Sequence, residues 1–137
     1  GDSGTITFDV NTLAPLTLTS DHNALDGADV VTALDGDNTA ILGGAADSMT
    51  VGDGNNTVVL DGGAIDLVEG VITNDANDLG GDDTLVAGDG FGRLVGGSGA
   101  DLFTLGEGGN FLLGDSGEIT FDVATDAPLT LDRKSVV

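Results

Sequence analysis

Residues 96–104 read GGSGADLFT, a glycine-rich turn sequence with one aspartate followed by a short apolar stretch. Nine-residue segments with this layout run without a slip from Ala24 to Val68 and again from Asp78 to Asp122. Positions 2 to 5 of the segments are rich in Gly, Asp and Asn, which tolerate the positive φ of tight turns. Position 8 is apolar in every segment, as one inward side chain per short strand requires. Each segment therefore predicts a turn followed by a short strand.

Two longer repeats are superimposed on this period. The sequence GDSGTITFDVNTLAPLTLT at residues 1–19 returns as GDSGEITFDVATDAPLTL at residues 114–131. Residues 24–59 also match residues 78–113 without gaps, so that Asp29 aligns with Asp83 and Asp47 with Asp101. If two nine-residue segments make one coil, each half-unit contains three coils of about 18 residues.

From these repeats we expect an all-β fold, a right-handed parallel β-roll or β-solenoid of about 18 residues per coil, with two facing sheets around a thin aliphatic core. Residues 1–137 are expected to form a single β-roll module with half-units at about 1–59 and 60–113, while 114–137 starts the next repeat. Residues 69–77 have the length of one segment, so we expect them to continue the winding.

Composition limits the partners of the chain. It carries 24 acidic residues against three basic ones, a formal net charge of −21, and no cysteine. We expect neither nucleic acid nor anionic membrane surfaces as partners, because their phosphates would be repelled. We also expect no membrane insertion, since no apolar run reaches the length of a span. A hydrophobic content of 39% argues against a disordered acidic chain. The compact state therefore needs a cation to neutralise it.

Position 6 of the segments alternates between two chemistries. It is aspartate in one series, at Asp29, Asp47, Asp83 and Asp101, and mostly asparagine in the other. Alternate segments lie on opposite edges of a two-segment coil, so the aspartates should stack on one edge. Coils in a parallel stack are about 4.8 Å apart, a distance at which carboxylates repel each other. Ca²⁺ removes this conflict because it takes about six to eight oxygen ligands, and a glycine-rich turn can offer backbone carbonyls.

These segments resemble the RTX, or hemolysin-type, calcium-binding family, whose nonapeptide is GGxGxDxUx. Residues 96–104 match it at every defined position, and LGGAADSMT at residues 42–50 is a weaker copy. The resemblance implies calcium sites between successive turns, formed by position-6 carboxylates and turn carbonyls.

The best two sites implied in this way pair Asp29 with Asp47 and Asp83 with Asp101. The glycines of the same turns would supply carbonyl ligands: Gly27, Gly43, Gly81, Gly97 and Gly99.

The chain departs from the family pattern where isoleucine stands in place of the ligand. These residues are expected to pack inward and to interrupt the metal ladder: Ile6, Ile65 and Ile119. On the opposite edge, two readings stay open for Asn38, Asn56 and Asn110. Each could give an amide oxygen to a metal, or they could form a metal-free hydrogen-bonded ladder. The ladder is favoured because a neutral amide attracts Ca²⁺ less than a carboxylate does.

The remaining polar residues give no catalytic signature, and we expect no enzyme activity. His22 is expected in a surface loop, since no Ser or Cys motif supplies a nucleophile for it. Arg93 is expected on the surface, beside carboxylates. Four acids at position 3 of the asparagine-edge turns are expected to be solvated: Asp35, Asp53, Asp89 and Glu107.

The sequence thus favours a calcium-binding structural repeat that folds and stiffens on meeting calcium. The resemblance also implies type I secretion and an extracellular or bacterial cell-surface location, as in adhesins. The expected partners are neighbouring copies of the same repeat, stacked end to end, and no adhesion target is indicated. Two alternatives stay open: a self-assembling extracellular filament in which metal is secondary, and a non-catalytic RTX appendage of a secreted enzyme.

Overall fold

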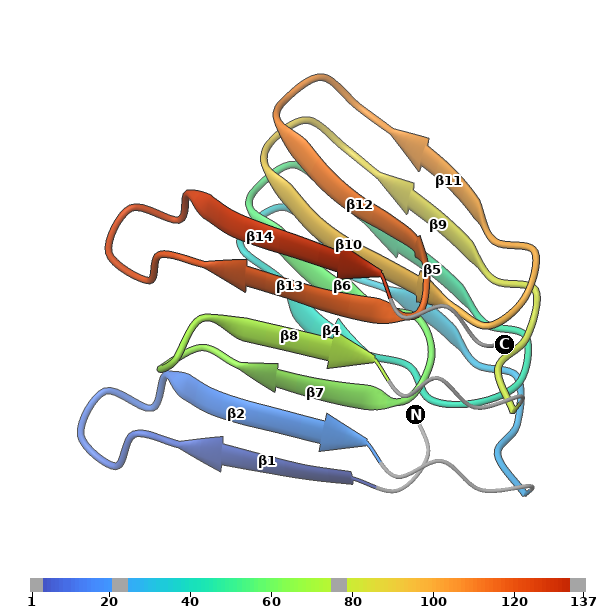
Figure 1. Cartoon of the computed structure of the whole chain (residues 1–137), viewed down its shortest axis with the longest axis horizontal. Helices are drawn as coiled ribbons and strands as arrows, with labels where there is room; N and C mark the ends of the chain where they lie inside the picture. The colour runs from blue at the N-terminus through green and yellow to red at the C-terminus, as the bar shows by residue number, and fades with distance from the viewer. Residues whose placement is uncertain (1–3, 21–24, 75–78, 134–137) are drawn as a thin grey trace.

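The computed structural model describes residues 4–20, 25–74 and 79–133, which form fourteen β-strands in three sheets (Figure 1). Within these ranges there is no helix, and so none that is long and apolar enough to cross a membrane. The all-β class expected from the sequence is therefore correct.

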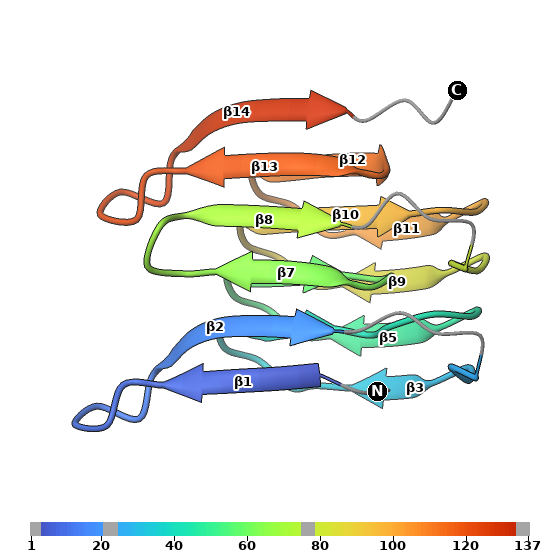
Figure 2. The same cartoon turned by 60° about the horizontal axis from the view of Figure 1, so that its bottom comes forward.

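Six strands form an antiparallel sheet, which we call the hairpin sheet, in the order β1-β2-β7-β8-β13-β14 (Figure 2). Its strands are β1 (Gly4–Phe8), β2 (Pro15–Ser20), β7 (Gly63–Asp66), β8 (Val71–Asn74), β13 (Gly117–Phe121) and β14 (Pro128–Arg133). Each hairpin pairs with the next, so that Leu18 lies opposite Ile65 and Ile72 opposite Ile119. The pairing creates one apolar row across the sheet: Ile6, Leu18, Ile65, Ile72, Ile119 and Leu131.

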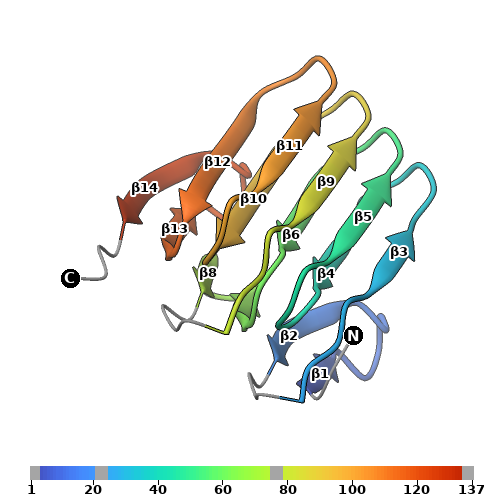
Figure 3. The same cartoon turned by 90° about the vertical axis from the view of Figure 1, so that its right-hand side faces the viewer.

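The other eight strands form two parallel sheets of four strands each (Figure 3). The outer sheet contains β3 (Val30–Thr32), β5 (Ser48–Val51), β9 (Thr84–Ala87) and β11 (Leu102–Leu105). The middle sheet contains β4 (Thr39–Ile41), β6 (Asn56–Val59), β10 (Gly92–Gly97) and β12 (Asn110–Asp115). Val30 pairs with Ser48, and Ser48 pairs with Thr84. The residues of the second pair are twice as far apart in sequence as those of the first, because hairpin β7–β8 lies between them.

The expected right-handed parallel β-roll is wrong. The chain does not pass continuously between two facing sheets, because antiparallel hairpins interrupt the parallel pairing and build a third sheet. Residues 71–74, part of the stretch expected to continue the winding, form β8 and turn back against β7. The tight turn from Leu67 to Gly70 brings these two segments together, so β7 pairs with its neighbour in sequence and not with a strand one coil away.

Local sequence favours these hairpins. Strand β1 reads GTITF and β2 reads PLTLTS, so apolar residues alternate with threonine, a pattern that favours strands. All of β1 is exposed, because it is an edge strand of the sheet, whereas β2 is partly buried. Asp9 closes the turn between them, since its carboxylate accepts the N–H groups of Asn11 (2.8 Å) and Thr12 (2.9 Å). These hydrogen bonds, with the one from Thr12 first, lower the pKa of Asp9.

The two central strands of the middle sheet, β6 and β10, are buried on both faces. Val58 and Val59 are neighbours in β6 with no exposed surface, yet they belong to different apolar clusters. Val58 packs with residues of the outer sheet, and Val59 packs with residues of the hairpin sheet. Adjacent strand residues point to opposite faces, so the middle sheet supplies side chains to both cores. Leu112, at the corresponding position of the last middle strand, is 40% exposed.

Arg93 lies inside the protein, which corrects the expectation of a surface position. It is 5% exposed and pairs with the Asp126 carboxylate in the β13–β14 turn at 2.7 Å. Its guanidinium donates to the Thr57 hydroxyl (3.1 Å) and lies over the rings of Phe121 (4.2 Å) and Phe91 (5.2 Å). Strand β10 carries this residue toward the last hairpin, so Arg93 fastens that hairpin to the middle sheet.

Glycines allow the turns between the parallel sheets to stack closely. Gly54 has a φ of 137°, and a Cβ on it would overlap the carbonyl of Gly36 in the adjacent turn. On the opposite edge, Ala45 takes a φ of 70°, whereas Gly99, its counterpart in the second half-unit, takes 130°. A side chain is costly in this left-handed region, so Ala45 is a strained position.

Two leucines at equivalent places in the first and last hairpins test the core assignment. Leu18 is 7% exposed, whereas Leu131 is 44% exposed. We expect Leu18→Ala to lower the free energy of unfolding by about 2–4 kcal/mol and Leu131→Ala by less than about 1 kcal/mol. Urea denaturation measures both changes. Equal losses would show that β2 is no better covered than β14.

Strain at Ala45 predicts a stabilising substitution. Ala45→Gly should raise the free energy of unfolding by about 0.5–1 kcal/mol, because glycine adopts positive φ without a steric penalty. The matched control, Gly54→Ala, should destabilise the protein, since it adds a side chain at φ 137° against Gly36. Thermal unfolding distinguishes the two, and a lower melting temperature for Ala45→Gly would contradict the assigned conformation.

Candidate metal site

Four aspartates stack at the N-terminal ends of the outer-sheet strands. Asp29, Asp47, Asp83 and Asp101 each stand directly before a strand, and parallel pairing of these strands places one above another. The backbone N–H of Asp29 donates to the Asp47 carboxylate (2.7 Å), and that of Asp47 donates to Asp83 (2.7 Å). The N–H of Asp83 donates to Asp101 (3.1 Å). We call this array the aspartate ladder.

The ladder is longer than the sequence predicted. Both expected pairs come together, and the structure also joins Asp47 to Asp83, across hairpin β7–β8 in the sequence. This link forms because the hairpin leaves the parallel stack and lets β5 pair directly with β9. Ile65 does not interrupt the ladder as expected, since it is buried in the hairpin sheet. Ile119 is buried there too, but Ile6 is 54% exposed and does not pack inward.

Burial leaves ladder oxygens without donors. Asp83 is 1% exposed, and one carboxylate oxygen of Asp83 and one of Asp101 are buried with no hydrogen-bond partner. Burial raises the pKa of Asp83 to about 7, with further upward contributions from the charges of Asp61, Asp101 and Asp47. Burial also raises the pKa of Asp101. A buried carboxylate without a counter-charge is costly, so these groups require a proton or a cation.

Asp61 joins this buried group from the hairpin side and was not predicted. It has no exposed surface, accepts the N–H of Ser98 (2.5 Å) on Oδ2, and has no partner on Oδ1. Burial raises its pKa to about 7, and the charges of Asp101 and Asp47 add to the rise. A Cβ on Gly80 or Gly97 would overlap its carboxylate. The available signal was its match with Asp115, at the same offset that relates the two half-units.

The asparagine edge forms a hydrogen-bonded ladder. The Asn38 side chain donates to the Asn56 amide oxygen (2.9 Å) and to the carbonyls of Leu34 (3.0 Å) and Gly36 (2.9 Å). Asn110 has no asparagine beneath it, but its amide oxygen fills the space that a Cβ on Gly92 would need. The first two amides are therefore hydrogen-bonded to each other and to the turns. The choice between a metal-free ladder and metal ligation at this edge stays a prediction.

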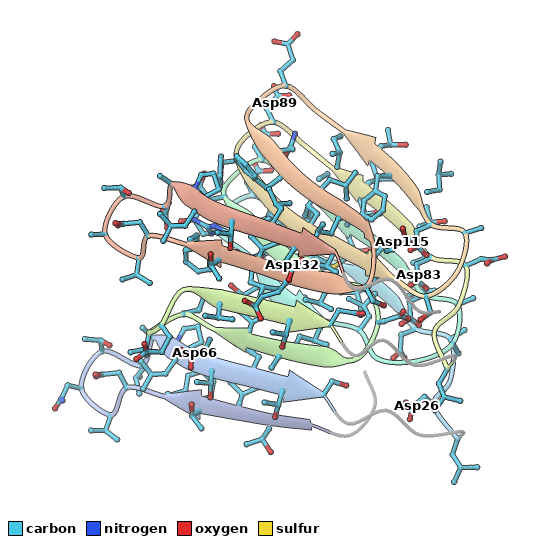
Figure 4. The ribbon with its side chains drawn as sticks, viewed as in Figure 1. Asp26, Asp66, Asp83, Asp89, Asp115 and Asp132 are labelled. Carbon is cyan, nitrogen blue, oxygen red and sulfur yellow. The ribbon has the colours of Figure 1, made fainter. Side chains whose placement is uncertain are left out.

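A second series of acids lies on the same edge and faces solvent. The backbone N–H of Asp53 donates to Asp35 (3.1 Å), that of Asp89 to Asp53 (2.8 Å) and that of Glu107 to Asp89 (2.7 Å). All four residues are exposed, as expected for solvated turn acids. Figure 4 shows Asp83 and Asp89 in different turns, at the two ends of β9. The chain thus offers one buried and one solvated carboxylate array.

The glycines implied as carbonyl ligands lie in turns at the ladder end of the strands. Gly43, Gly97 and Gly99 have φ values of 120°, 117° and 130°. A Cβ on Gly81 would overlap the backbone of Ala45, whereas a Cβ on Gly27 would meet no atom within 4 Å. Their place beside the ladder agrees with the sequence, and their role as ligands stays a prediction.

The carboxylate oxygens suit a hard cation such as Ca²⁺. Buried oxygen atoms that lack donors lie on Asp61, Asp83 and Asp101. Within the described ranges, however, no three side chains of the types Asp, Glu, His and Cys converge so as to hold a metal ion. An ion in the ladder would therefore draw on fewer carboxylates and on the backbone. His22 lies outside the described residues.

Comparison with known proteins adds no assignment. No family model matches the chain, and no curated protein or solved structure matches it. The resemblance to the RTX nonapeptide therefore rests on the repeated motif alone.

The raised pKa values predict an inverted pH dependence of stability without metal. The folded protein holds protons on Asp61 and Asp83 up to a pKa of about 7, whereas the unfolded chain releases them near the model value of 3.8. In chelator, the free energy of unfolding should thus fall as pH rises from about 4 to about 7, and then level off. Urea unfolding at pH 4.5, 6 and 8 measures this.

Asp61→Asn is the informative variant for this dependence. Its amide oxygen can still accept the N–H of Ser98 but does not titrate, so the fall in stability should be shallower than in the parent. Asp89→Asn, at a solvated position, should keep the full slope. A parent protein that gains stability between pH 4.5 and pH 7 in chelator would refute the buried-acid assignment.

Proposed function

We propose that this protein is a calcium-binding structural repeat whose aspartate ladder takes up Ca²⁺ and is stabilised by it. The observation that carries the proposal is the set of buried carboxylate oxygens without donors on Asp61, Asp83 and Asp101. At neutral pH such groups are stable only with a proton or a positive ion beside them.

Charge and chemistry favour calcium over the alternatives. A net charge of −21 opposes a compact state and favours uptake of divalent cations. Mg²⁺ needs near-ideal octahedral geometry and gives up water reluctantly, whereas Ca²⁺ accepts irregular sets of carboxylate and carbonyl oxygens. Asp83 and Asp101, with the carbonyls of Gly81, Gly97 and Gly99, would hold such an ion. Asp29 and Asp47, with the carbonyls of Gly27 and Gly43, would hold another.

Metal binding would act on the whole fold. Each ladder aspartate precedes a different strand of the outer sheet, so an ion that bridges two of them joins segments far apart in sequence. Because the unfolded chain has no such arrangement, binding free energy adds to folding free energy. The repeat would be loose where calcium is scarce and stiff where it is abundant. This agrees with the extracellular or cell-surface bacterial location, type I secretion and non-catalytic role that the RTX resemblance implies.

Assembly without metal is the second candidate function. The apolar row of the hairpin sheet is exposed at both of its ends, at Ile6 (54%) and Leu131 (44%). Exposed strand edges are templates for pairing with further strands. A filament subunit would have this surface whether or not the ladder holds calcium.

A substitution within the ladder tests calcium binding. At pH 8 the parent protein should melt at a higher temperature in Ca²⁺ than in chelator, since Ca²⁺ at about 100 times its Kd adds about 2.7 kcal/mol per site. Asp83→Asn should lose most of this gain, yet in chelator it should be at least as stable as the parent, because a neutral amide is cheaper to bury.

Asp89→Asn is the matched control for that experiment, because Asp89 is exposed and belongs to the solvated array. It should keep the full calcium response, and isothermal titration calorimetry should show unchanged stoichiometry. The proposal fails if Ca²⁺ does not raise the melting temperature of the parent, or if both variants lose the response equally.

A further inference from the structure

The first and last hairpins are the same structure with different surroundings. Both contain a register shift at the end of the first strand, at Thr7/Phe8 and at Thr120/Phe121. Both have a threonine pair across the strands with hydroxyl oxygens 2.6 Å apart. Both have a residue with positive φ in the turn, Leu13 at 59° and Asp126 at 58°. Any difference in burial between them therefore reports on their neighbours.

Strand β2 has neighbours that β14 lacks. β2 pairs with β7, and it packs against β4, whose Ile41 contacts the apolar cluster that contains Leu18. As a result Leu18 is 7% exposed. The same PLTL sequence in β14 leaves Leu129 64% and Leu131 44% exposed. The apolar side chains of β14 thus correspond to side chains that are buried or half-buried in β2, but they are exposed in β14.

The last strands of the two parallel sheets also have exposed apolar side chains. Leu94 in β10 has no exposed surface, whereas Leu112, paired with it in the last middle strand, is 40% exposed. Leu102 at the start of the last outer strand is 60% exposed. Within the described residues, no strand pairs with the outer edges of β11, β12 and β14, which lie at one end of the sheets (Figure 2).

We propose that this end of the molecule binds a second copy of residues 25–74 of the same repeat. In that arrangement β3 and β4 of the second copy pair in parallel with β11 and β12, and its β7 pairs antiparallel with β14. Leu131 then lies opposite Ile65 of the second copy, as Leu18 lies opposite Ile65 within one chain.

The occupant is identified by the shape of the surface. A covering element must supply an antiparallel strand for β14, two parallel strands for β11 and β12, and an apolar residue over Leu131. When residues 25–74 cover β2, which has the PLTL sequence of β14, they supply the antiparallel strand β7 and contacts from β4. The same residues contain β3 and β4, the edge strands of the two parallel sheets at the opposite end from β11 and β12. Hairpin β13–β14 then takes the place of the second copy's β1–β2. The contact joins unlike ends of the molecule, so it is heterologous and leaves each added copy with a further end of the same kind.

A longer chain tests this proposal. Residues 21–74 are placed after Arg133, in place of residues 134–137, so that β14 continues as β2 does. Amide hydrogen exchange in β14 and β12 should slow by about tenfold or more relative to the parent, toward the rates of β2 and β6. Thermal unfolding should remain one transition at a higher temperature. Measurements in chelator and in Ca²⁺ separate this result from calcium binding.

The matched control carries Ile41→Asp and Ile65→Asp in the added copy alone. These substitutions remove the residues that would cover Leu131, so exchange in β14 should return to the parent rate. Leu131→Asp should lower the melting temperature of the longer chain strongly and that of the parent little. Unchanged exchange in β14, equal exchange in the control, or loss of protection in β6 of the parent portion would overturn the proposal.

Discussion

Parallel pairing in register is the constraint on which this structure depends. It places each turn of the parallel sheets directly above its counterpart, so that Asp47 stacks on Asp83 and the Gly54 backbone lies against Gly36. A side chain in one turn must therefore be compatible with the side chains at the same position of the turns stacked above and below it. The same register that forms the hydrogen-bonded asparagine pair also forces carboxylates into a buried line, where they need counter-charge. The asparagine pair and the line of buried carboxylates thus come from one geometric rule.

The hairpin sheet buries one face of the middle sheet, which the two parallel sheets alone would leave exposed. Two four-stranded sheets would leave one face of the middle sheet in water, yet Val59 and Val95 on that face have no exposed surface. The hairpin sheet covers them, and the segment that leads into β7 brings Asp61 beside the ladder. The hairpins also leave the parallel stack between β5 and β9, which allows the ladder to continue from Asp47 to Asp83.

Sequence reasoning predicted the parts of this fold that are governed by local period. The short strands, their pairing at every second segment and the stacked aspartates all follow from the nine-residue pattern. The third sheet was missed because LDGGAIDLV fits the same pattern, and the choice between a coil and a hairpin depends on which strand β7 meets. Asp61 and Arg93 were missed for a related reason. Their partners, Ser98 and Asp126, lie in distant parts of the sequence.

The Arg93–Asp126 ion pair distinguishes the last hairpin from the first, although their sequences are nearly the same. The first and last hairpins are nearly identical in sequence, so a folding chain could place either one against β10. Only the last has a carboxylate at this position of the turn, because Leu13 stands where Asp126 does in the other. An incorrectly placed first hairpin would bury the guanidinium without its carboxylate partner, which is unfavourable. A single charged pair therefore protects the order of the strands against errors that repetition would otherwise permit.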